Sequence, residues 1–173
     1  MRWLIDGYNV IRRDPDLRGA EASSLEAGRR ALLGRLSAVA RRSPDRFTVI
    51  FDGAPSHAPA TSGGQLEVLF SRPPDKADDV LIRLARQTGA GAVLVSSDRM
   101  VGDAARRAGC TVLRADVFLG AIAPDDQRGD EAGDDRAGDE DDDTDDRAKR
   151  GNPRRLSRDE RAAQRAVRRL RSY

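Results

Sequence analysis

The chain has 173 residues, which is enough for one globular domain with an apolar core and gives little reason to expect two. Its formal net charge of +2 conceals a strong segregation, because residues 125–146 carry 13 acidic and 2 basic side chains whereas residues 147–173 carry 2 and 11. A single cysteine excludes an intrachain disulfide and a cysteine-based zinc site, and no apolar stretch approaches the roughly 20 residues of a membrane helix. We therefore expect a cytoplasmic protein without a membrane partner.

Apolar runs and helical spacings alternate along the first 124 residues. Short apolar runs bounded by turn residues predict strands, whereas apolar residues three and four positions apart predict amphipathic helices. The elements expected in chain order are a strand at 3–5, a helix at 23–42, strands at 46–51 and 65–71, a helix at 73–88, a strand at 92–97, a helix at 99–108, and a strand with a short helix at 111–123.

This alternation predicts an α/β fold. The strands are apolar on both faces, as in a parallel or mostly parallel sheet covered by helices. Three of them run into an aspartate, at Asp6, Asp52 and Asp98. Because ligands of open parallel sheets bind beyond the carboxyl ends of the strands, we expect the three carboxylates at one edge. One such aspartate is often only a turn or helix cap, so the repetition carries the argument.

A fourth carboxylate is expected at the same edge, near the start of the helix at 73–88. Asp78 shares a helical stripe with Ile82 and Ala85, whereas Asp79 shares one with arginines, so Asp78 is predicted to point inward and Asp79 toward solvent. Carboxylates gathered in this way repel one another unless a cation neutralises them. Ligation by oxygen alone suits Mg²⁺ or Mn²⁺, which can activate water and stabilise displacement at phosphorus.

Four segments, LIDGYNVI, VIFDG, ADDVLIRLA and VSSD, occur in this order between Arg2 and about Ala123. In this combination the chain resembles the YacP-type NYN domains, a branch of the PIN-like ribonuclease superfamily. The resemblance implies a PIN-like three-layer α/β/α sandwich with a mostly parallel central sheet, and metal-dependent RNA cleavage. For the YacP branch it implies a ribosome-associated endoribonuclease that acts on messenger RNA.

The same resemblance implies roles for individual residues. By the pattern of the family, the catalytic acids that bind the metal are Asp6, Asp78 and Asp98. Asn9 is then a polar residue of the site, and Asp52 is a supporting acid on the second strand. We expect hydrolysis that leaves a 5′-phosphate and a 3′-hydroxyl.

Asp103 has two interpretations. PIN-like proteins often carry a further metal-binding acid about five residues beyond the position of Asp98, and Asp103 has that spacing. Asp103 also lies four residues from both Arg99 and Arg107, which is the spacing of an exposed, ion-paired helix face. A metal ligand and a surface residue both remain open for this position.

An RNA substrate requires positive charge beside the acids, because phosphate contacts supply most of the sequence-independent affinity. An exposed aromatic side chain can in addition stack on a base. The alternative for each residue singly is an ordinary surface arginine or a tyrosine packed on the sheet edge. The candidates for RNA binding are Tyr8, Arg12, Arg13, Arg72 and Lys76.

Composition divides the chain into three parts. Residues 1–124 are expected to form the nuclease-like domain. Residues 125–155 run from acidic to basic with almost no apolar side chains, which predicts a disordered linker. Residues 156–173 resume helical spacing and predict a basic amphipathic helix that either docks on the domain or awaits a partner.

These features together predict a metal-dependent endoribonuclease that cleaves single-stranded RNA. The alternative is a non-catalytic adaptor on the same fold that binds RNA or the ribosome. A pure binder has no use for repelling carboxylates, which favours the enzyme. A phosphatase with Asp6 as nucleophile is disfavoured, because enzymes of the haloacid-dehalogenase type carry a second acid two residues later and Tyr8 stands there.

Overall fold

The computed structural model describes residues 1–53, 64–123 and 157–172. The linker expected at 125–155 therefore lies outside the described residues. Within the described part, no helix has the length and apolar character that crossing a membrane requires.

A five-stranded sheet forms the centre of the described part, with the strand order β3-β2-β1-β4-β5. Every pairing between neighbouring strands in it is parallel. The expected α/β architecture with a mostly parallel sheet is confirmed. The strands are β1 Arg2–Asp6, β2 Arg46–Phe51, β3 Leu66–Phe70, β4 Ala92–Val95 and β5 Thr111–Leu113.

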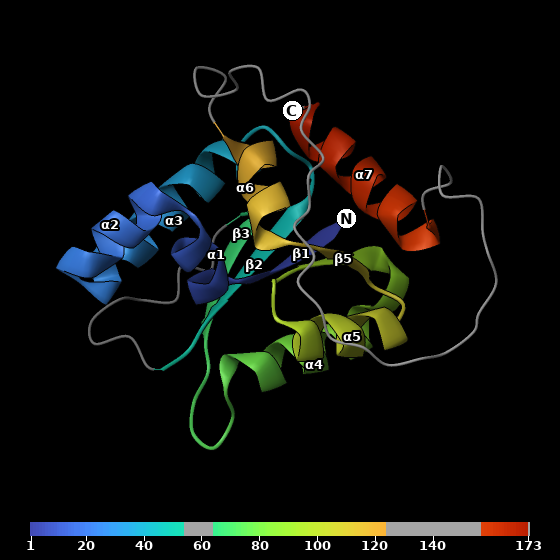
Figure 1. Ribbon diagram of the computed structural model, residues 1–173, viewed down its shortest axis with the longest axis horizontal. Coiled ribbons are helices and arrows are strands. Elements are labelled where there is room, and N and C mark those ends of the chain that lie inside the picture. The colour runs from blue at the N-terminus through green and yellow to red at the C-terminus, as the bar shows by residue number, and fades with distance from the viewer. Residues whose placement is uncertain (54–63, 124–156, 173) are drawn as a thin grey trace, which may run out of the picture.

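Helices cover both faces of this sheet and produce three layers (Figure 1). One face packs on the larger apolar core, to which α1, α2, α3, α6 and α7 contribute, and the other packs on a smaller core shared with α4 and α5. A short 3₁₀ turn, Gly89–Gly91, follows α4. The helices are α1 Gly7–Arg13, α2 Pro15–Ser23, α3 Leu25–Ala40, α4 Ala77–Thr88, α5 Arg99–Arg107, α6 Ala115–Ile122 and α7 Arg158–Arg171.

Two short helices, α1 and α2, were not expected from the apolar pattern. Asp6 caps α1 by accepting a hydrogen bond from the backbone N–H of Asn9 (3.2 Å), and Asp14 caps α2 in the same way through Leu17 (2.9 Å). Pro15 occupies the first position of α2, where its missing N–H costs nothing. The capping signals were present, but helices of 7 and 9 residues are too short to display a clear apolar period.

The C-terminal helix α7 docks on the body, which decides between the two alternatives left by the sequence. Ala166 and Leu170 are buried in the larger core, and α7 packs on α6 and β5. Arg169 donates to both carboxylate oxygens of the fully buried Asp45, at 2.8 to 3.2 Å, and the indole N–H of Trp3 donates to the same carboxylate (3.1 Å). This ion pair joins residues 124 positions apart.

Candidate functional site

A pocket of about 510 Å³ opens at the carboxyl ends of β1 and β2, where α1, α4 and α5 begin. Four carboxylates line it, as the sequence predicted: Asp6, Asp52, Asp78 and Asp98. The parallel sheet brings them together, because three of them follow strands that end at this edge and the fourth lies in the first turn of α4. The remaining lining residues are Tyr8, Asn9, Arg12, Arg13, Leu25 and Ala77.

Asp6 is the most buried of the four acids, with 8% of its surface exposed. One carboxylate oxygen accepts from the backbone N–H of Asn9, and the other accepts from the hydroxyl of Ser96 (3.0 Å). Burial raises the pKa of Asp6, the two hydrogen bonds lower it, and the charges of Asp78 and Asp98 raise it again, with a net increase. The fold thus holds a carboxylate at a place that disfavours its charge.

Asn9 and Ser96 connect the end of β1 to the start of α5. The side-chain oxygen of Asn9 accepts from the backbone N–H of Ser97 (2.9 Å), and the hydroxyl oxygen of Ser96 accepts from that of Asp98 (3.1 Å). Asp98 in turn caps α5 through the N–H of Val101 (3.1 Å). Asn9 therefore fixes the loop that carries Asp98.

Asp52 is held from the neighbouring strand. One of its carboxylate oxygens accepts from the hydroxyl of Ser71 (2.6 Å) and from the backbone N–H of Ala77 (3.2 Å). The hydroxyl oxygen of Ser71 also accepts from the N–H of Gly53 (3.2 Å). These bonds attach the start of α4, and with it Asp78, to the end of β2.

Asp78 differs from the other three acids because it makes no hydrogen bond or ion pair within the described part of the chain. Desolvation raises its pKa, and the charges of Asp98 and Asp52 raise it further. Asp79 turns the other way, where its carboxylate accepts from the backbone N–H of Lys76 (2.9 Å) at the start of α4. Asp78 thus faces the pocket while Asp79 serves the helix end, as the helical stripes predicted.

The donor set suits a hard divalent cation, since it consists of carboxylate and amide oxygens. The described residues nevertheless contain no three acidic, histidine or cysteine side chains close enough to hold an ion together. Mg²⁺ keeps several water ligands and is usually bound by one or two protein carboxylates, so direct ligation by three is not required. The uncompensated charge at Asp6 and Asp78 is the feature that a cation would neutralise.

A chain of cationic and aromatic side chains borders the pocket. The guanidinium of Arg12 lies over the ring of Tyr8, 5.6 Å from its centroid, and Arg29 donates to the Tyr8 hydroxyl (3.1 Å). Arg29 also lies over the ring of Phe70 at 5.5 Å, and Tyr8 packs edge-on against Phe51. Sequence reasoning missed Arg29, because nothing in the pattern of α3 distinguishes it from the other arginines of that helix.

Three of the proposed site residues lie elsewhere. Asp103 is ion-paired with Arg106 (2.9 Å) on α5 and does not line the pocket of the four acids. Lys76 lines an adjoining hollow of about 400 Å³ together with Asp52. Arg72 is exposed and lines neither.

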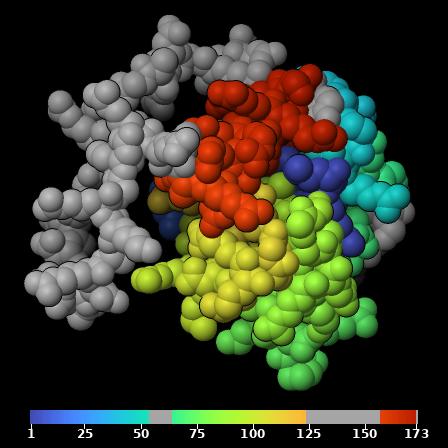
Figure 2. Space-filling model, turned by 90° about the vertical axis from the view of Figure 1, so that its right-hand side faces the viewer, coloured from blue at the N-terminus to red at the C-terminus, as the bar shows by residue number. Residues whose placement is uncertain are grey.

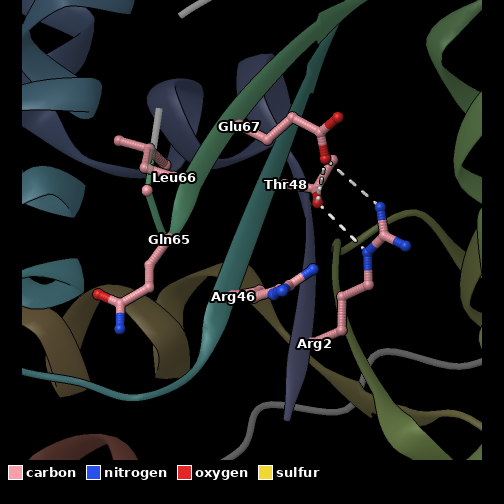
Figure 3. Close-up of a pocket in the computed structure, with 7 residues that line it drawn as sticks. Arg2, Arg46, Thr48, Gln65, Leu66 and Glu67 are labelled. Atoms are coloured by element: carbon pink, nitrogen blue, oxygen red, sulfur yellow. Dashed lines mark hydrogen bonds and ion pairs between the residues drawn. The ribbon is translucent and has the colours of Figure 1, made fainter. Parts of the chain in front are cut away.

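Another pocket, of about 430 Å³, lies at the opposite ends of the strands (Figure 3). Its charged groups are largely paired, because Arg2 donates to the hydroxyl of Thr48 (3.4 Å) and to Glu67 (3.4 Å). It contains a single carboxylate, Glu67, and therefore lacks the charge of the pocket formed by the four acids.

Comparison with known proteins adds an independent observation. Residues 3–169 match the family described as the YacP-like NYN domain. The chain belongs to this family. NYN domains are part of the PIN-like nuclease superfamily, which indicates a function of the ribonuclease type. The matched range begins in β1 and extends through most of α7.

Individual relatives of this NYN domain come from Bacillus subtilis. The chain is 28% identical to uncharacterized protein YacP of strain 168 over 85 residues, which are 48% of this chain and 50% of that protein. The alignment therefore spans about half the length of this curated relative. Crystal structures of Rae1 (YacP) and of a point mutant superimpose with TM-scores of 0.60 and 0.57 at 24% and 25% identity, covering 70% of this chain and 73% and 74% of theirs. They share its fold.

Proposed function

We propose that this protein is an endoribonuclease that requires Mg²⁺ or Mn²⁺ and hydrolyses single-stranded RNA in the cytoplasm, with messenger RNA on the ribosome as its substrate. The observation that carries the proposal is the pocket of four carboxylates, in which Asp6 is buried and Asp78 has no partner among the described residues. A protein that only binds RNA gains nothing from this arrangement, because it repels phosphate.

In this proposal Asp6, Asp78 and Asp98 are the acids that hold the metal. A divalent ion bound there supplies positive charge that activates water and stabilises the negative charge developing at phosphorus. Asn9 and Asp52 position these acids, since Asn9 fixes the loop of Asp98 and Asp52 fixes the start of α4. Asp103 is left as a surface residue, consistent with its ion pair to Arg106.

The RNA strand follows the basic side of the pocket. Arg12 and Arg13 line the pocket and are exposed, so they can neutralise phosphates on either side of the cleaved bond. Tyr8 is half-buried between Phe51 and Arg12, so its ring serves as a floor under the arginine more than as a free stacking surface. Arg72 and Lys76 add positive charge in the segment that leads into α4.

The test is cleavage of end-labelled single-stranded RNA by the purified full chain, with Mg²⁺, Mn²⁺ or EDTA. We expect internal cuts that leave 5′-phosphates, and no cuts in EDTA. Asp6→Asn and Asp78→Asn should each lower the rate by at least about a hundredfold, because each removes one acid of the set. Asp79→Asn is the matched control, since it changes the same charge on the same helix turn but outside the pocket.

Two results would contradict the proposal. One is cleavage that persists in EDTA or in Asp78→Asn at the rate of the unmodified protein. The other is absence of cleavage both on free RNA and on messenger RNA engaged by translating ribosomes, with equal RNA binding by the protein and its variants. The second result would establish the non-catalytic adaptor instead.

A further inference from the structure

The outward face of α7 carries an unusual concentration of arginine. Arg158, Arg161, Arg165 and Arg168 are spaced by three, four and three residues, so they share one face of the helix, which we call the α7 arginine face. All four are exposed, and none forms an ion pair with another described residue. The opposite side of the helix, with Ala166 and Leu170, is buried in the core.

Docking fixes the direction in which this face points. Arg169 is bound to the buried Asp45, and the start of α7 is near α5 through Arg106 and Asp159 (3.9 Å). Both ends of the helix thus contact the body, which fixes the direction of the arginines on its outward face. Figure 2 looks onto this side of the molecule and shows α7 lying across it.

The α7 arginine face lies far from the pocket of the four acids. Asp45 directly precedes β2, and Arg106 lies at the end of α5 opposite to Asp98, so both contacts of α7 are at the ends of the elements that point away from the pocket. Both α7 and α1 pack on the larger core, but Figure 1 shows α7 beside α6 and β5, near the N-terminus of the chain, and at a distance from α1. One short single strand in the pocket therefore does not reach these arginines.

The chemistry of the face selects its partner. Four guanidinium groups spaced along a helix match a row of phosphates, which they can contact by paired hydrogen bonds. No aromatic side chain accompanies them among the described residues of α7, so the face offers nothing on which unpaired bases could stack. Such a surface fits an RNA whose bases are already paired and whose backbone is regular, that is, a double helix.

We propose that the α7 arginine face is a second RNA-binding surface, which holds the phosphate backbone of double-helical RNA without reading its sequence. The choice of RNA as the partner rests on the function proposed above. The surface anchors the protein on a folded RNA while the pocket at the carboxyl ends of the strands takes a single strand. The affinity of this surface for RNA depends on charge, so it should fall steeply as the salt concentration rises.

The experiment is fluorescence anisotropy with a labelled RNA duplex of about 16 base pairs, titrated with the full chain in EDTA at several salt concentrations. The test variant combines Arg161→Gln and Arg165→Gln, which keep helix propensity and remove two charges. We expect duplex binding at about 0.15 M salt to weaken by roughly tenfold or more, and the slope of log K against log salt to become shallower by about two.

The control variant combines Arg18→Gln and Arg86→Gln, two exposed arginines on α2 and α4 without ion pairs in the described part. It has the same net charge as the test variant and should bind the duplex like the unmodified protein. Equal weakening in both variants, or an unchanged slope in the test variant, would overturn the proposal. The proposal would also be overturned if the test variant kept its duplex binding but lost binding to phosphatidylserine vesicles. That result would identify an anionic lipid surface as the partner.

The outcome is separable from the nuclease proposal. Duplex binding is measured in EDTA and needs no cleavage, so it decides the α7 arginine face even if the pocket proves inactive. Conversely, both variants should cleave a short single strand at the rate of the unmodified protein. A test variant that lost this cleavage as well would show that the arginines act on the pocket, and it would contradict a separate surface.

Discussion

Gly7 lies where β1 passes directly into α1, between Asp6 and the rest of the pocket. A Cβ atom at this position would come within 2.2 Å of Cε1 of Phe51, far inside van der Waals contact. The absence of a side chain therefore allows α1 to lie against β2. That approach sets the direction of Asn9 and, through it, the loop of Asp98.

Gly7→Ala is expected to destabilise the fold by about 1 to 3 kcal/mol, because the Phe51 ring and the start of α1 must separate. Gly34→Ala is the matched control, since Gly34 is exposed in the middle of α3 and a Cβ there meets nothing within 4 Å. The control should stabilise the protein by up to about 1 kcal/mol through helix propensity. Chemical denaturation of both variants measures the difference, and an unchanged stability of Gly7→Ala would contradict the packing argument.

The orientation of a pocket residue could be predicted from the sequence where the helical period decides which way its side chain points. Asp78 and Asp79 are adjacent, yet helical stripes alone assigned the first to the pocket and the second to the helix end. Asp103 was undecidable from spacing, because a metal ligand and an ion-paired surface residue need the same intervals. The structure gives it Arg106 as a partner, three residues away, where the sequence suggested Arg99 and Arg107.

At the scale of elements, α7 is fixed by one ion pair and a narrow apolar stripe. Burial raises the pKa of Asp45, but hydrogen bonds from Arg169, from the amino group of Met1 and from Trp3 lower it to about 2 overall. A carboxylate with a lowered pKa stabilises the fold above its ordinary pKa of 3.8, and this contribution is lost as the pH falls toward about 2.

Arg169→Ala is expected to lower the free energy of unfolding by about 1 to 3 kcal/mol near neutral pH, less than for a fully buried pair because Arg169 is half-exposed. Arg168→Ala, a change at the preceding and exposed position of α7, should alter the free energy of unfolding by less than about 0.5 kcal/mol. Denaturation at several pH values measures both. The deficit of Arg169→Ala should shrink below about pH 4 as Asp45 takes up a proton, and a deficit that does not depend on pH would contradict this role.

Strands and helices with a clear apolar pattern were predicted from the sequence, whereas the two short helices and the docking surface of α7 were not. The apolar strands predicted a parallel sheet because parallel strands are buried on both faces. The helices α1 and α2 were missed, since capping by Asp6 and Asp14 is a weaker signal than an apolar period. The docking of α7 was left open, because a stripe of alanine, valine and leucine does not say which surface it covers.

Among the described residues, charge is concentrated in two separate regions, the acids at the carboxyl ends of the strands and the arginines of α7, whose contacts with the body lie at the opposite ends of β2 and α5. The pKa values of Asp6 and Asp78 are both raised. Their ionised forms therefore weaken the fold as the pH rises above their ordinary range, and a cation bound between them would remove that cost. Protons and metal compete for the same oxygens, so metal affinity should fall on acidification.

Calorimetric titration of the RNA-free chain with Mn²⁺ tests most directly whether the pocket of four carboxylates is a cation site. We expect Mn²⁺ binding by the unmodified protein near pH 7, weaker binding near pH 5, and a loss of at least about tenfold in affinity in Asp78→Asn. Asp79→Asn should bind Mn²⁺ like the unmodified protein, because the Asp79 carboxylate accepts a hydrogen bond at the start of α4 and does not face the pocket. Equal Mn²⁺ affinity in Asp78→Asn and the unmodified protein would contradict a cation site formed by these carboxylates.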